Sequence, residues 1–195
     1  MDGRKIISEL ENPIDNILII LSIKFGDILH KYKFITPNII TTISIILSII
    51  AIYFIYIKYY KIGAILFFIS YFFDCLDGNF ARRFNMVTTF GDYYDHIGDI
   101  FKYLLLIYVI LISNLKNITK YIFIILIIIC GFLSLIHLGC QEKIYNNKSV
   151  LKILKIICLK RFDINYTKYF GSGTTIFIIF IYLFFIKELN MYFKN

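Results

Sequence analysis

The sequence is poor in the charged residues that cover soluble proteins. Only 17% of its 195 residues are charged, whereas 59% are hydrophobic and 18% aromatic, and the mean hydropathy is +0.75. Soluble domains carry about 25% charged residues and a smaller apolar share. The composition therefore excludes an ordinary soluble domain and predicts an all-α, polytopic membrane protein in which residues 1–195 form a single domain.

Targeting and cross-linking signals are missing as well. Residues 1–13 are polar, and the first apolar stretch lacks a small-residue cleavage site, so we expect no secretory signal peptide. The four cysteines, at positions 75, 130, 140 and 158, have neither metal-binding nor disulfide spacing. We therefore interpret all four as reduced packing residues.

The net charge of +8 does not have the pattern of a nucleic-acid-binding protein. The lysines lie between apolar runs and form no recognisable motif or basic helix. A membrane surface is the better partner for this charge, and we expect no nucleic acid.

Apolar runs predict the helices. Residues 13–34 have apolar side chains at helical spacing but are interrupted by Asp15, Lys24 and Asp27, which favours an amphipathic helix lying in the membrane interface. Residues 36–187 are expected to form the transmembrane bundle. Residues 150–159 are too short and too basic for a confident crossing, so we expect five to six transmembrane helices. The five clear ones are residues 38–57, a segment starting near 62, and residues 88–113, 121–138 and 169–186.

Two pairs of aspartates lie between two long apolar runs, in residues 74–99. Asp74 and Asp77 are three residues apart, and Asp95 and Asp99 are four apart, so each pair shares one helix face. Two helices joined near residues 85–89 would bring the pairs together. Four carboxylates at membrane depth repel one another, and each costs several kcal/mol if unpaired. The pattern therefore predicts a bound cation.

The candidate ligands are all oxygen atoms. Such sets favour hard ions, Mg²⁺ or Mn²⁺, over zinc, and we expect two ions. Mg²⁺ usually completes its coordination shell with substrate phosphate. The expected substrate therefore carries a phosphate or a diphosphate.

The segment 74–99 resembles one enzyme family closely. Its spacing, D-x2-D-G-x2-A-R-x8-G-x3-D-x3-D, is similar to the signature of the CDP-alcohol phosphatidyltransferases, integral membrane enzymes of phospholipid synthesis. The resemblance implies attack of an alcohol on a CDP-linked donor, formation of a phosphodiester and release of CMP. Two rival classes remain open: a membrane prenyltransferase, and a channel or proton-relay protein that uses buried acids.

The resemblance also implies roles for single residues. Asp74, Asp77 and Asp95 would bind metal, and Asp99 would complete the second metal site or accept the alcohol proton as the catalytic base. The remaining positions would contact the CDP moiety: Gly78 and Ala81 at the cytidine, Arg82 at phosphate, and Asn38 in the nucleotide pocket. Arg82 is alternatively a topology anchor, and Asn38 alternatively only part of a helix start.

His96 divides two branches of the family. A histidine after the third aspartate resembles the aminoalcohol phosphotransferases, where it is implicated in proton removal, whereas residues 81–85 and 89–91 resemble phosphatidylinositol synthases. Those synthases have an arginine directly after the last aspartate, where this chain has Ile100. We favour the aminoalcohol branch, with the CDP-diacylglycerol branch as the alternative. His137 and Glu142 are weaker candidates for acceptor recognition.

Charge also predicts pairing and orientation. Lys102 lies one turn after Asp99 and is expected to pair with an acid.

The positive-inside rule predicts that the N-terminus and the site face the cytoplasm. The membrane would be the endoplasmic reticulum in a eukaryote and the cell membrane otherwise. The predicted cytoplasmic side holds Lys143, Lys148, Lys152, Lys155, Lys160, Arg161 and Lys168, and the other holds Lys58, Lys61, Lys116, Lys120, Lys187 and Lys194. The resemblance further implies a homodimer.

Overall fold

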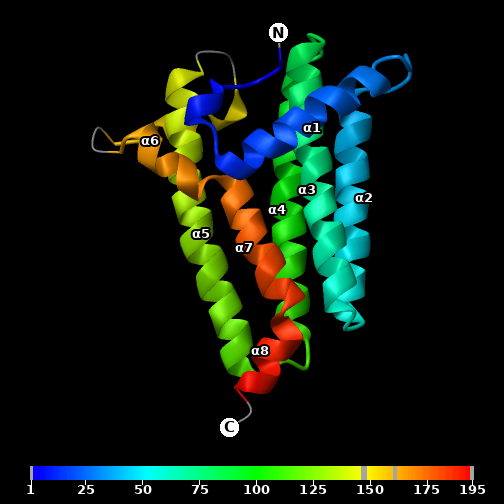
Figure 1. The fold of residues 1–195 in the computed structure, drawn as a ribbon, viewed down its shortest axis with the longest axis vertical. Helices are drawn as coiled ribbons and strands as arrows, with labels where there is room; N and C mark the ends of the chain where they lie inside the picture. The colour runs from blue at the N-terminus through cyan, green and yellow to red at the C-terminus, as the bar shows by residue number, and fades with distance from the viewer. Residues whose placement is uncertain (1, 146–148, 160–161, 194–195) are drawn as a thin grey trace.

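The structure, a computed structural model, describes residues 2–145, 149–159 and 162–193. Within these ranges it contains helices and no strand, which confirms the all-α prediction. The axes of the long helices lie roughly along the length of the bundle (Figure 1). They are α2 (Pro37–Tyr56), α3 (Tyr60–Arg83), α4 (Thr89–Ile112), α5 (Asn117–Ile144) and α7 (Ser172–Phe184).

Within the described residues, four helical stretches are long and apolar enough to cross a membrane. They are Pro37–Tyr56, Tyr60–Arg83, Asn117–Ile144 and Ile164–Phe184, the last of which joins α6 (Ile164–Thr167), η3 (Lys168–Phe170) and α7. Helix α4 is 24 residues long, as is α3, but its three aspartates and Lys102 keep it out of this set. The segment that left a sixth crossing open forms η2 (Val150–Ile156), a 3-10 helix of seven residues packed against α5.

Small residues let the long helices pack closely, because they allow two backbones to approach. A Cβ atom added at Gly63 of α3 would lie 2.7 Å from the Ala51 carbonyl oxygen of α2. One added at Gly98 of α4 would lie 2.7 Å from Ile45 Cδ1 of α2. Helix α2 is therefore held tightly against both helices that carry the acidic residues.

Helix α1 (Pro13–Leu29) crosses one end of the bundle (Figure 1). It begins at Asn12, whose side-chain oxygen accepts hydrogen bonds from the backbone of Ile14 and Asp15. The amide of the same Asn12 donates to the Lys168 carbonyl oxygen at 2.6 Å and to Thr174 Oγ1 at 2.7 Å, which ties α1 to the start of α7. The outer face of α1 exposes large apolar side chains, as an interfacial helix would: Ile17, Ile20, Leu21, Phe25 and Ile28.

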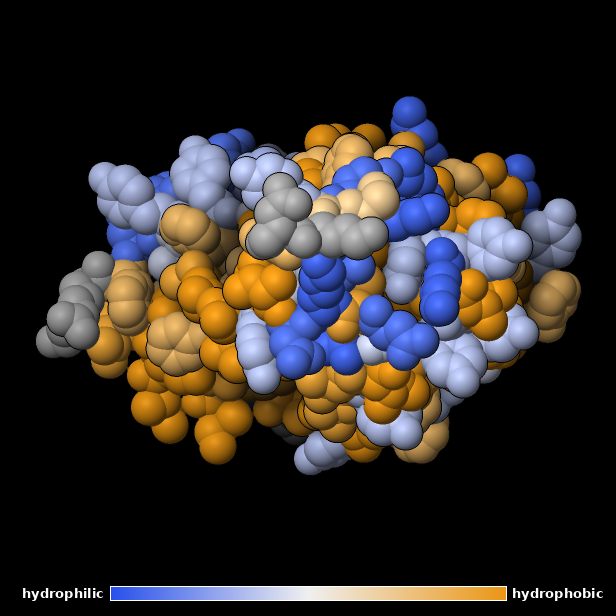
Figure 2. Space-filling view, turned by 90° about the horizontal axis from the view of Figure 1, so that it is seen from below, coloured by the Kyte–Doolittle hydropathy of each residue, from blue (hydrophilic) through white to orange (hydrophobic). Residues whose placement is uncertain are grey.

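The opposite end of the bundle lies by α8 (Ile186–Tyr192). Hydrophilic side chains gather toward the middle of this end, with hydrophobic ones around them (Figure 2). Lys61, at the start of α3, forms an ion pair with Glu188 at 3.1 Å, and Lys116 donates to the Phe193 carbonyl oxygen at 3.1 Å. Of the basic residues counted for orientation, Lys148, Lys160, Arg161 and Lys194 lie outside the described residues.

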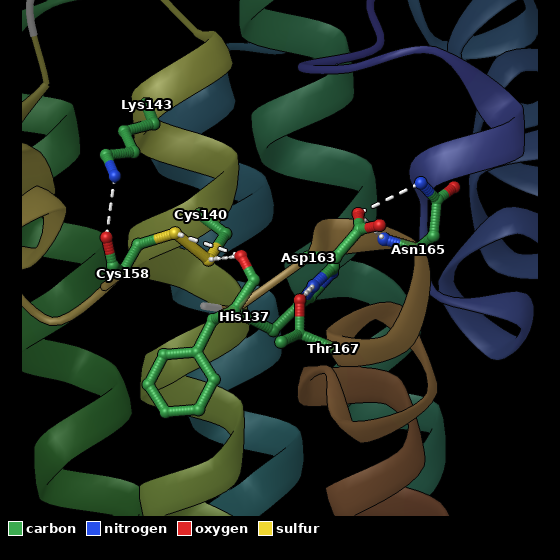
Figure 3. The surroundings of a disulfide bond; sticks show 8 residues. His137, Cys140, Lys143, Cys158, Asp163, Asn165 and Thr167 are labelled. Carbon is green, nitrogen blue, oxygen red and sulfur yellow. Dashed lines mark hydrogen bonds between the residues drawn. A yellow bond between two sulfur atoms is a disulfide. The ribbon is translucent and has the colours of Figure 1, made fainter. Parts of the chain in front are cut away.

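The cysteine prediction is wrong for one pair. Cys140, near the end of α5, and Cys158, just after η2, form a disulfide (Figure 3). Cys75 and Cys130 are free. Eighteen residues separate the disulfide-bonded pair in the sequence, and only the return of η2 onto α5 brings the sulfurs together. Gly139 permits this return, because a Cβ there would overlap the backbone of Leu154.

Candidate active site

Two acidic pairs face each other near the end of the bundle that α1 crosses. Asp74 and Asp77 lie in the second half of α3, and Asp95 and Asp99 lie in the first half of α4, which runs in the opposite direction. Lys102 joins the two helices. Its Nζ lies 2.6 Å from Asp74 Oδ1 and 2.7 Å from Asp99 Oδ1, so the predicted pairing of Lys102 with an acid is confirmed.

Helix α2 supplies hydrogen bonds to this cluster. Thr41 Oγ1 donates to Asp77 Oδ2, and Ser44 Oγ lies 3.4 Å from Lys102 Nζ. Asp77 is buried, so the Thr41 hydrogen bond holds one of its oxygens in a fixed direction. These hydroxyl groups depend on the close packing of α2 described above.

The cluster has the properties of a cation site. Asp95 Oδ1 is buried and has no hydrogen-bond partner among the described residues. A buried carboxylate oxygen without a donor is costly, and a bound cation would satisfy it. One ligand atom each from Asp95, His96 and Asp99 also lie within 4.8 Å of one another. The donor set therefore fits a divalent ion, with His96 offering a nitrogen ligand beside the oxygens.

His96 lies between two carboxylates. Its Nε2 is 3.2 Å from Asp92 Oδ1, one turn earlier on α4, and its Nδ1 is 3.6 Å from Asp95 Oδ2. Asp92 in turn accepts a hydrogen bond from the Val150 backbone at 2.7 Å, which fastens η2 to the start of α4. The imidazole is thus oriented by a neighbouring acid at the edge of the cluster.

A first cavity, of about 120 Å³, adjoins the acids on the side of α2. Asn38 at the start of α2, Gly78, Ala81 and Arg82 all line it, as do Asp77 and Asp95. The structure thus brings together the four residues for which the family resemblance implied contact with the CDP moiety. Gly91 also lines this cavity, and a Cβ there would lie 3.0 Å from Asn38 Oδ1, so the glycine lets the start of α4 approach α2.

The guanidinium group of Arg82 lies close to Gly78. A Cβ added at Gly78 would lie 3.2 Å from Arg82 Nη1, so a side chain there would displace the guanidinium group. Arg82 Nε donates to the Gly3 carbonyl oxygen at 2.8 Å, and the residue lines the cavity. Arg83 instead turns to α1, where it pairs with Asp27 at 2.6 Å and donates to the Ile23 carbonyl oxygen.

A second, larger cavity of about 450 Å³ lies between α1, α3, α4, α5 and α7. Asp74, Asp99 and Lys102 form its wall near the acids, and apolar side chains line it farther away, among them Phe67, Ile127, Ile176 and Ile179. His137 and Gln141 of α5 line it too, whereas Glu142 does not line it and pairs with Lys5. An apolar cavity with polar groups at one end is a typical ligand site.

Two buried acids of the N-terminal region face this larger cavity. Burial raises the pKa of Glu11, an effect opposed by the Asn12 backbone N–H, the Arg82 and Arg4 charges, and a hydrogen bond from Gln141. Burial likewise raises the pKa of Asp15 to about 7, against the hydrogen bond that it accepts from Tyr71. The Tyr71 hydroxyl donates to Asp15 Oδ1 at 2.7 Å, and the Gly173 backbone N–H donates to Asp15 Oδ2 at 3.2 Å.

The family comparison agrees with this geometry. The sequence model described as CDP-alcohol phosphatidyltransferase matches residues 34–194. The chain belongs to this family. It is therefore a transferase of substituted phosphate groups that acts in phospholipid synthesis with a CDP-alcohol donor and an alcohol acceptor, and the family uses divalent metal ions. The curated proteins and the solved structures contain no match to the chain.

Several residues of the site could not be found from the family signature. Thr41 and Ser44 lie in an apolar run that reads only as a transmembrane helix, and Tyr71 is one of 16 tyrosines. Lys5 is separated from the signature by about seventy residues, yet it lines both cavities. Nothing in its local sequence distinguishes it from the other lysines.

Proposed function

We propose that this transferase moves a phosphoaminoalcohol group, phosphocholine or phosphoethanolamine, from its CDP-linked donor to a lipid alcohol such as diacylglycerol. The main support for this proposal is the position of His96, which borders both cavities and lies beside Asp92 and Asp95. A histidine at this place is the feature that resembles the aminoalcohol branch.

The alternative is transfer of a phosphatidyl group from CDP-diacylglycerol, as in phosphatidylinositol synthases. Those enzymes have an arginine at the position of Ile100. Here the Ile100 side chain is 61% exposed on the outer surface of α4 and lines neither cavity. This position therefore offers no cation to the site, which weighs against the alternative.

The two cavities suggest how the substrates divide. In this proposal the cytidine and its phosphates enter the smaller cavity, where Asn38, Gly78 and Ala81 leave room and Arg82 binds a phosphate oxygen. The lipid alcohol enters the larger cavity, whose apolar wall suits acyl chains. The acceptor hydroxyl then meets the donor phosphate beside Asp99 and His96.

Asp74, Asp77, Asp95 and Asp99 would hold two ions, Mg²⁺ or Mn²⁺. Bound ions would neutralise the diphosphate charge and polarise its oxygens. Asp99 or His96 removes the proton of the acceptor hydroxyl, because both line the larger cavity next to the acid cluster. The hydroxyl oxygen forms the new phosphodiester bond, and CMP leaves. Two copies of the chain form the working enzyme, with the site facing the cytoplasm.

A substrate panel tests the branch. The purified protein in vesicles that contain diacylglycerol should release CMP from CDP-choline or CDP-ethanolamine when Mg²⁺ or Mn²⁺ is present. The comparison arm supplies CDP-diacylglycerol with inositol, serine or glycerol phosphate. Turnover in that arm alone would overturn the aminoalcohol assignment.

His96→Ala separates the two candidate bases. If His96 takes the proton, the variant loses the acidic limb of the pH–rate profile together with most of its rate. An unchanged profile would return the role to Asp99. Thr42→Val is a control on the neighbouring helix, because Thr42 contacts the Tyr94 hydroxyl at 3.0 Å and lines neither cavity.

A further inference from the structure

The first residues of the chain pack onto the end of α3 that carries the family signature. Asn79 Nδ2 donates to the Asp2 carbonyl oxygen at 2.8 Å, and Arg82 Nε donates to the Gly3 carbonyl oxygen at 2.8 Å. Gly3 has a φ of +70°, and a Cβ there would lie 2.6 Å from the Asn79 carbonyl oxygen. Only glycine fits this conformation and this close approach without strain.

This contact directs Lys5 into the site. Of the residues that the structure describes, four line both cavities, namely Lys5, Arg82, Asp95 and His96. These residues lie at the boundary where the two cavities meet. In the proposed function, the phosphate group passes here from the nucleotide in the smaller cavity to the acceptor alcohol in the larger one. Lys5 is the only one of the four that comes from outside residues 34–194, the region that the family model matches.

Glu142 holds the ammonium group at this boundary. The carboxylate belongs to the end of α5, is fully buried and pairs with Lys5. Ser149 Oγ donates to Glu142 Oε1 at 3.2 Å, whereas Oε2 has no partner among the described residues. Because the Lys5 side chain is 18% exposed, its charge is largely withdrawn from water and acts strongly on a phosphate at the boundary.

We propose that Lys5 is a catalytic residue that binds a non-bridging oxygen of the phosphate undergoing transfer, with Glu142 as its positioning residue. The acceptor oxygen forms a bond to phosphorus, the bond from phosphorus to the CMP oxygen breaks, and the hydroxyl proton goes to the base. Lys5 remains protonated and stabilises the charge on the phosphate oxygens. This proposal requires the family reaction but neither choice of branch.

Lys5→Gln is the primary variant, and Lys5→Arg restores the charge. Arg4→Gln is the matched control, because Arg4 pairs with Asp2 and Asn16 and lines neither cavity. CMP release is measured with both donor types, and melting temperatures are measured in detergent. We expect Lys5→Gln to lower kcat about a hundredfold with little change in KM, as for loss of one transition-state donor. Lys5→Arg should recover most of the rate, and Arg4→Gln should match the wild type.

A structural role alone predicts different results. If Lys5 only fastens the N-terminal segment to Glu142, the rate loss follows the loss of melting temperature, and Glu142→Gln is as damaging as Lys5→Gln. That outcome, or a Lys5→Gln rate within about threefold of the wild type, overturns the proposal. Turnover of CDP-diacylglycerol alone would contradict the aminoalcohol branch, while the ratio between variants would still test Lys5.

A binding measurement gives a readout that does not depend on turnover. Lys5 is labelled with an amine-reactive reagent in the wild-type protein, with and without CDP and Mg²⁺, and the modified lysines are identified by mass spectrometry. We expect CDP with Mg²⁺ to protect Lys5 and to leave Lys61, at the opposite end of the bundle, equally reactive. Equal labelling of Lys5 in both conditions would overturn the proposal even if no donor were turned over.

Discussion

Asp95 and Asp77 differ in how their carboxylate oxygens are satisfied, although both belong to the acid cluster. Asp77 accepts a hydrogen bond from Thr41, whereas Asp95 has one buried oxygen without a partner among the described residues. The hydrogen bond holds the Asp77 oxygen in place, whereas the Asp95 oxygen would be satisfied by a bound cation. Both arrangements are what a cation site requires of its ligands.

Replacing either acid tests the metal assignment. We expect Asp77→Asn and Asp95→Asn each to lower activity by more than about a hundredfold while membrane insertion stays intact, because each removes a charged metal ligand. Initial rates across a range of Mg²⁺ or Mn²⁺ concentrations are the measurement. Asp27→Asn is the matched control and should keep full activity, because Asp27 is an exposed acid of α1 that pairs with Arg83. Wild-type rates in either site variant would remove that residue from the metal site.

Lys102 neutralises part of the cluster through its contacts with Asp74 and Asp99. Lys102→Met leaves these buried acids without their cation, and losing one partner of a buried pair costs about 3–5 kcal/mol. We therefore expect a lower melting temperature in EDTA, and a larger stabilisation by Mg²⁺ than in the wild type, because the ion then meets uncompensated charge. Thermal unfolding in detergent, with and without Mg²⁺, measures both effects. A variant that responds less to Mg²⁺ than the wild type would show that Lys102 assists metal binding.

At this scale the sequence predicts the residues that a fixed spacing defines. The spacing on two helices predicts the shared faces of the four aspartates, and the resemblance to the family signature implies roles for Gly78 and Arg82. Lys5 and Thr41 are not, because their contacts join segments far apart in the chain and neither position stands out locally. The pairing of Lys102 is predictable, since Asp99 lies only three residues away on the same helix.

Among the elements, α1 and α7 meet through a buried polar contact. Asp15 accepts hydrogen bonds from Tyr71 and from the Gly173 backbone, and a Cβ at Gly173 would lie 2.8 Å from Asn12 Oδ1. The amphipathic pattern of residues 13–34 predicts α1 as a helix. It does not predict this contact, which depends on glycines more than 150 residues away.

The burial of Asp15 makes the stability of the protein depend on pH. Burial raises the pKa of Asp15 from 3.8 to about 7 in the folded protein. Between these values the folded protein keeps a proton that the unfolded chain has lost, so its free energy of unfolding falls as pH rises. The full effect is roughly 4 kcal/mol at 1.36 kcal/mol per pKa unit. We expect thermal unfolding in detergent from about pH 5 to pH 8 to show this decline, and Asp15→Asn to flatten it.

Asp27→Asn again provides a comparison, because Asp27 lies on the same helix but is largely exposed. Its pH profile should follow that of the wild type. If Asp15→Asn shows the same decline as the wild type, another group is responsible for the dependence. The prediction of reduced cysteines failed for Cys140 and Cys158, because the approach of these two residues depends on how η2 packs against α5.

For the whole molecule, two signals of orientation disagree. The basic residues counted from the sequence favour the cytoplasm for the end that holds the site. The disulfide between Cys140 and Cys158 lies at that same end, although such bonds persist mainly in oxidising compartments. The opposite end, with Lys58 and Lys61, carries fewer basic residues in its loops. The charge rule acts during insertion, whereas a disulfide forms afterwards and can be reduced, so we give the charge rule more weight.

Single cysteines in a background without the native four decide the orientation. Lys58→Cys, in the exposed turn between α2 and α3, reports on the opposite end, and Lys31→Cys, exposed just after α1, reports on the end with the site. In intact cells or sealed vesicles of known sidedness, we expect a membrane-impermeant maleimide to label position 58 from the side away from the cytoplasm. Position 31 should react only after permeabilisation. The reverse pattern would place the site, and with it the entry of the soluble CDP-linked substrate, on the oxidising side, where the disulfide would be stable.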